Sequence, residues 1–120
     1  MGDIYKDNCP KVTEKGAAYT IVADDNGKVF LQTGVSGTWT LPAIADVWNG
    51  WNVEIYNLGA TSLVVTAPSG KLIGFHNAAG TTITFSTAGN IIGAGVKIMY
   101  AATTGKYMAF AYGANTAVMS

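Results

Sequence analysis

The feature that most constrains the fold is a repeated rhythm of short apolar runs separated by turn-forming residues. From Ala18 onward, runs rich in β-branched and aromatic residues are interrupted by Gly, Asn, Asp, Ser or Pro, about every 8 to 12 residues as in sandwiches and barrels. No segment keeps the apolar periodicity of an amphipathic helix. The sequence therefore predicts an all-β fold: a single antiparallel β-sandwich or barrel-like domain of about eight short strands.

Several runs are expected to be strands, and two of them are expected to pair directly. Residues 18–23 and 28–33 flank the turn-forming Asp24–Gly27 and predict a hairpin. In 51–57, Trp51, Val53 and Ile55 alternate with polar residues, so they are assigned to the core together with Trp39. The loop 42–50 is expected to hold one helical turn. The remaining expected strands are 38–41, 62–67, 71–75, 81–86, 96–102 and 106–112.

Charge is scarce and balanced. Only 12% of the residues are charged, against 49% hydrophobic, and the net charge is +0 with no Arg. A chain of this kind has no basic field to gather nucleic acid or an anionic membrane, so neither is expected as a partner. Because a monomer needs charge to cover its surface, the scarcity also indicates oligomerisation.

The last two expected strands are apolar on both faces, which points to a contact between subunits. Met99 lies opposite the core-type residues of 96–100, and Met108, Phe110 and Tyr112 lie opposite those of 107–111. A strand covered by a loop would explain the same pattern, but the loops here are short. We therefore expect Met99, Met108, Phe110 and Tyr112 to form the contact between copies.

The first sixteen residues differ from the rest of the chain. They hold six of the fourteen charged residues, and they are expected to form an N-terminal arm, 1–16, preceding a β-domain, 17–120. The segment lacks the pattern of a signal peptide, so assembly in a cytoplasm is expected. A frayed terminus and an arm that orders on a partner are both compatible with such a segment. The candidate partner contacts are Ile4, Tyr5, Lys6, Lys11 and Val12.

Metal binding is not expected. Asp24, Asp25 and Asn26 precede Gly27 and resemble half of a calcium loop, but the distal Glu and the glycine register of that loop are missing. A turn accounts for these residues. Cys9 has no companion thiol and is expected to be an incidental free thiol.

Catalysis is not expected either. His76 is the only histidine, and no nucleophile pattern accompanies it. The isolated acids Asp46 and Glu54 are the only candidates for a glycosidase pair, and nothing indicates that they converge. The chain is therefore predicted to have no enzymatic activity and no cofactor. Trp48, beside Asn49 and Gly50, is the one plausible exposed platform for a sugar ring.

The order of the fragments resembles a known family. YTIVADDNGKVF, TWTLP, NGWNVEIYNLG, SLVVTAPSG, ITFSTAG and VKIMY follow one another between residues 18 and 100. This succession is similar to a β-module that recurs in phage tail-fibre, head-fibre and capsid decoration (cement) proteins. The loop PAIADVWNG is richer in aromatic residues than the family pattern, and KYMAFAYGANTAVMS replaces its usual short end.

The resemblance implies a homotrimeric structural protein of a bacteriophage virion, with no catalytic residues to carry over. Because a chain of 120 residues is little more than the module, we expect a decoration protein on the capsid surface. Its partners would be its own copies and the major capsid protein, and its effect would be to stabilise the shell. The alternative is a tail-fibre, head-fibre or spike tip that binds a host glycan receptor. A free carbohydrate-binding module is a third hypothesis.

Overall fold

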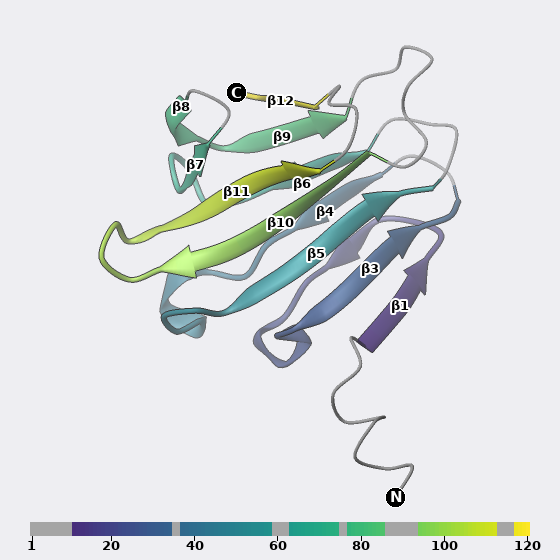
Figure 1. Cartoon of the computed structure of the whole chain (residues 1–120), viewed down its shortest axis with the longest axis horizontal. Helices are drawn as coiled ribbons and strands as arrows, with labels where there is room; N and C mark the ends of the chain where they lie inside the picture. Colours follow the sequence, from purple (N-terminus) through teal and green to yellow (C-terminus); the bar gives the residue numbers. More distant parts are fainter. Residues whose placement is uncertain (1–10, 35–36, 59–62, 75–76, 86–93, 113–116) are drawn as a thin grey trace, which may run out of the picture.

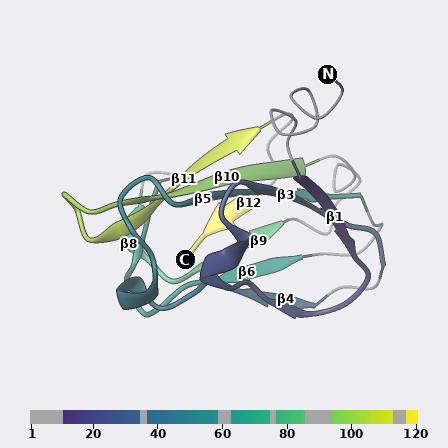
Figure 2. The same ribbon diagram turned by 90° about the horizontal axis from the view of Figure 1, so that it is seen from below.

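The computed structural model describes residues 11–34, 37–58, 63–74, 77–85, 94–112 and 117–120. These residues form two β-sheets packed face to face, seen edge-on in Figure 2. Two short 3₁₀ turns, η1 (Ala23–Asp25) and η2 (Ile44–Asp46), connect strands at one end. The predicted all-β, sandwich-like fold is confirmed, and η2 is the helical turn expected in the loop 42–50.

The described residues contain twelve strands, labelled in Figure 1 where there is room. Their bounds are β1 Lys11–Lys15, β2 Tyr19–Thr20, β3 Lys28–Gln32, β4 Thr38–Thr40, β5 Asn52–Asn57, β6 Val64–Thr66, β7 Leu72–Gly74, β8 Asn77–Gly80, β9 Thr82–Phe85, β10 Ala94–Ala101, β11 Lys106–Tyr112 and β12 Ala117–Met119. The seven-stranded sheet has the order β1-β3-β5-β10-β11-β7-β8, and the five-stranded sheet has the order β12-β9-β6-β4-β2.

The sheets are mixed rather than antiparallel, which corrects the expectation from sequence. From β1 to β6 the chain changes sheet at every connection, so β1, β3 and β5 lie in one sheet and β2, β4 and β6 in the other. After two changes of sheet the chain runs in its original direction. Neighbours in each sheet are therefore parallel: β1 with β3, β3 with β5, β2 with β4, and β4 with β6.

The hairpin expected between residues 18–23 and 28–33 is wrong for the same reason. β2 pairs with β4 in the five-stranded sheet, whereas β3 pairs with β1 and β5 in the other. The rings of Tyr19 and Trp39 meet Phe30 across the sandwich, each with a centroid 5.4 Å from that of Phe30. A hairpin would place Tyr19 and Phe30 in one sheet and remove this contact between sheets.

The core lies between the two sheets and confirms the assigned phase of the strands. Trp39, Trp51, Val53 and Ile55 are fully buried. Strand β5 shows strict alternation, with every second residue buried. The inward residues of β10 and β11 are buried too, so the opposite faces of these strands point away from the core.

The expected boundary between arm and domain is corrected at Lys11. Lys11–Lys15 forms β1, an edge strand that pairs in parallel with β3 over five residues. The backbone N–H of Thr33 donates to the Lys15 carbonyl (3.1 Å), and the Lys15 ammonium lies 4.3 Å from the centre of the Tyr19 ring. Residues 1–10 lie outside the described residues, so the folded domain includes part of the predicted arm.

Candidate functional site

The outer face of the seven-stranded sheet carries the residues that the sequence predicted for subunit contact. This face is turned toward the viewer in Figure 1. Met99 on β10 and Met108 on β11 are direct cross-strand partners, and Phe110 follows two residues later on the same face, 45% exposed. The structure brings these three side chains together. The side chain of Tyr112 lies outside the described part of the chain.

Strand register extends this apolar surface across the sheet. Val12, Val29, Glu54, Lys97 and Phe110 form one continuous row from β1 to β11. Glu54 and Lys97 occupy directly opposed positions, so opposite charges adjoin at its centre. Met108 continues the surface to Ile73 on β7. We define the outer face by its described apolar members, which are Val12, Val29, Leu31, Tyr56, Ile73, Met99, Met108 and Phe110.

A glycine shapes the middle of the outer face. Gly95 on β10 is the register partner of Tyr56 on β5, and the tyrosine ring lies across it. A Cβ atom at position 95 would overlap ring atoms of Tyr56. The ring therefore lies against β10 instead of standing away from the sheet, a covering of glycine that is known to stabilise strands.

The segment Asp24–Gly27, for which the sequence predicts a simple turn, contains a buried charge at Asp25. The Asp25 side chain is 3% exposed and accepts hydrogen bonds from the Lys28 ammonium (2.7 Å), the Tyr19 hydroxyl (2.8 Å) and the Val22 backbone N–H (3.0 Å). Burial alone would raise the pKa of Asp25, but these donors outweigh it and hold the pKa below its ordinary value. Asp24, its exposed neighbour, makes no such contacts.

This geometry corrects the expectation that Asp25 serves only a turn. The carboxylate joins β2, η1 and the start of β3, and so fixes the point where the chain leaves one sheet for the other. Asp25 could bind a metal ion only if these three hydrogen bonds were broken. Among the described residues, no group of three His, Cys, Asp or Glu side chains is placed to hold a metal ion.

The two isolated acids considered for glycosidase chemistry lie in different places. Glu54 is on the outer face, whereas Asp46 ends η2 and lines a cleft beside the five-stranded sheet. The structure does not bring them to one site. His76 and Cys9 lie outside the described residues, as do Ile4, Tyr5 and Lys6; of Lys11 only the backbone is described.

Trp48 is exposed, as the sequence predicted. Its side chain is 51% exposed on the loop between η2 and β5. Two hydrogen bonds hold this loop against β10 and the turn that follows it: Gly50 N–H to the Tyr100 carbonyl (2.9 Å) and Ala102 N–H to the Asn49 side chain (3.0 Å). The indole is therefore presented from an anchored loop.

Comparison with known proteins leaves the fold and these surfaces as the basis for any functional conclusion. No protein-family model matches the chain, and no curated protein matches it in sequence. In the described part of the chain, no helix is long and apolar enough to cross a bilayer. The molecule belongs to the class of all-β sandwiches built from two mixed sheets.

Proposed function

We propose that this chain is a non-enzymatic bacteriophage structural protein, a capsid decoration protein that forms homotrimers on the capsid surface and stabilises the shell. The observation that supports it most is the outer face, an apolar surface that crosses six strands in register and has opposed charges at its centre. Contiguous apolar surfaces of this kind mark interaction sites. The family resemblance supplies the number three and a structural role on a virion.

The outer face offers a contact surface that suits a chain with so little charge. Met99, Met108 and Phe110 are adaptable or aromatic side chains of the types enriched at protein interfaces. Because these residues point away from the core, their contacts serve association and not the fold of one copy. Burial in a trimer removes the apolar surface that would otherwise favour aggregation.

Charging the outer face should separate the subunits without unfolding them. We expect Met108→Lys combined with Phe110→Lys to convert the trimer to a monomer in light scattering at micromolar concentration, because the two like charges lie beside Lys97 and would be buried in the contact without partners. The β-sheet circular dichroism signal should persist. Thr82→Lys, a change on the five-stranded sheet, is the matched control and should leave the trimer intact. A stable wild-type monomer would refute the proposed assembly.

We propose that the N-terminal segment binds the capsid. Because β1 begins at Lys11, deletions that end before and within β1 can be compared. Deleting residues 1–10 is expected to leave a folded trimer that no longer occupies undecorated capsids, since Ile4, Tyr5 and Lys6 are removed while β1 remains. Deleting residues 1–15 should also lower the melting temperature, because it strips the edge strand from β3. Occupancy is measured by sedimentation with capsids. Full decoration by the 1–10 deletion would show that the β-domain itself binds the shell.

One observation favours the alternative, a fibre or spike tip that binds a host glycan. Trp48 offers an exposed aromatic face from an anchored loop, which is how sugar rings are commonly stacked. Copy number in purified virions separates the two functions: hundreds of copies fit decoration, and a handful fits a fibre tip.

A further inference from the structure

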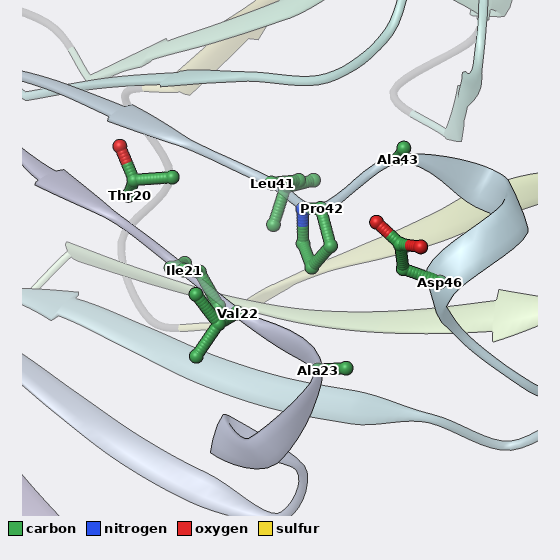
Figure 3. Close-up of a pocket in the computed structure, with 8 residues that line it drawn as sticks. All are labelled: Thr20, Ile21, Val22, Ala23, Leu41, Pro42, Ala43 and Asp46. Carbon is green, nitrogen blue, oxygen red and sulfur yellow. The ribbon is translucent and has the colours of Figure 1, made fainter.

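A second feature, separate from the outer face, is a cleft of about 430 Å³ beside the five-stranded sheet. It opens where the parallel strands β2 and β4 end and the segments that follow them separate. The segment after β2 leads into η1, and the segment after β4 leads into η2, as Figure 3 shows. Its lining residues are Thr20, Ile21, Val22, Ala23, Leu41, Pro42, Ala43 and Asp46. None of them belongs to the outer face.

The two walls of the cleft are held from the opposite sheet. The Trp51 indole N–H donates to the Ala23 carbonyl on one wall (2.9 Å), and the Tyr107 hydroxyl donates to the Pro42 carbonyl on the other (2.8 Å). Trp51 and Tyr107 are fully buried and pack edge to face, with ring centroids 5.8 Å apart. The cleft is therefore preformed, so a ligand would not need to order its walls on binding.

The chemistry of the cleft is apolar with a single negative group. The buried Ile21, Leu41 and Pro42 line the cleft, and Val22 and Ala43 are its exposed apolar residues. The Asp46 carboxylate extends from η2 toward Pro42 (Figure 3). Burial, together with the nearby Tyr100 and Asp46, raises the pKa of Tyr107. The Tyr107 hydroxyl thus stays protonated and keeps donating to Pro42.

The carboxylates near the cleft have no cation of their own in the described part of the chain. There, the one ion pair joins Lys28 to Asp25. Asp46 and the exposed Asp24 on η1 make none. An apolar cleft bordered by an unpaired carboxylate is complementary to a side chain with an aliphatic stem and a cationic end.

We propose that this cleft is a docking site for a Lys or Arg side chain presented by a partner protein. The aliphatic stem lies across the cleft along its apolar lining, and the cationic group meets the exposed Asp46 carboxylate at the rim. The volume accommodates such a side chain with its adjoining backbone, since pockets for drug-sized ligands begin at about 300 Å³. This site acts independently of self-association through the outer face.

The test uses blocked tripeptides, acetyl-Gly-X-Gly-amide, with X as Lys, Arg, norleucine or Glu. In NMR titrations of the full chain, the Lys and Arg peptides are expected to shift the backbone amides of Val22, Ala23 and Ala43 with millimolar affinity that weakens with salt. Asp46→Asn should weaken binding by up to about fivefold, the upper end of the range for an exposed ion pair. Glu54→Gln, a carboxylate lost from the outer face, should change nothing at the cleft.

Ala43→Leu, which narrows the cleft from one wall, provides a second variant and should abolish the shifts with the melting temperature unchanged. Equal binding of the norleucine or Glu peptide, or undiminished binding to Asp46→Asn, would overturn the proposal. Shifts confined to other surfaces would overturn it as well. Oligomers of N-acetylglucosamine are titrated in parallel, and their binding in the cleft without peptide binding would assign the site to a glycan instead. Trimer formation is recorded for each variant, so failure here is distinct from failure of the proposed assembly.

Discussion

Trp51→Ala is expected to lower the free energy of unfolding by about 3–5 kcal/mol, the usual cost of emptying the space of a buried aromatic side chain. Trp51 is fully buried immediately before β5 and packs against Tyr107. The same change removes the indole donor of the Ala23 carbonyl, which is left without that partner beside η1. Since domains of this size have stabilities of about 5–15 kcal/mol, little would remain.

A smaller change should cost less. Trp51→Phe keeps one buried aromatic ring but loses the indole N–H and part of the bicyclic ring, so we expect a loss of about 1–3 kcal/mol. Urea unfolding at one fixed protein concentration measures both variants, because stability of an oligomer depends on concentration. An unchanged midpoint for Trp51→Ala would contradict the assigned core.

Alternation within single strands could be read from the sequence because it depends on local geometry. The inward set Trp51, Val53 and Ile55 follows from the two-residue period of a strand, and the structure buries all three. The outward placement of Met99 and Met108 follows from the same period. To predict that these two residues pair directly, one needs in addition only the short turn that joins β10 to β11.

Pairing between strands could not be read in the same way. A turn-forming sequence such as Asp24–Gly27 fits a hairpin, and nothing local reveals that Asp25 points inward and sends the chain to the other sheet. β1 was missed because its alternation of Val12 with charged residues is that of an edge strand, which resembles a solvated arm. Strands β8, which contains Ala78 and Ala79, and β12 are short and lack a strong β pattern. They form because they pair with β7 and β9, respectively.

The cleft was beyond sequence reasoning for a related reason. Its walls come from residues 20–23 and 41–46, and its bracing donors are Trp51 and Tyr107. Only the parallel pairing of β2 with β4 puts these segments side by side. Asp46 carried a signal as an isolated acid, but its environment depends on that topology.

The second large expected effect on stability concerns the buried carboxylate of Asp25. Asp25→Ala should lower the free energy of unfolding by about 3 kcal/mol, because it removes the acceptor of the Tyr19 hydroxyl and the Val22 N–H and breaks an ion pair. Lys28 is 30% exposed and can turn to water, which limits the loss. Asp24→Asn, on the exposed neighbour, is the control and should stay within about 0.5 kcal/mol.

The pH dependence of this effect has a definite sign. Because the folded-state pKa of Asp25 is lowered, the unfolded chain binds more protons than the folded chain in the interval between the two values. The stabilisation is therefore fully present above the ordinary carboxyl pKa of about 4 and is lost as pH falls through the folded-state value. Asp25→Asn cannot titrate, so its deficit relative to the wild type should be constant from about pH 5 to 7 and shrink below pH 4. Urea unfolding of both proteins across this range measures the difference. A deficit that stayed constant down to pH 2 would mean that the carboxylate charge does not hold β2, η1 and β3 together.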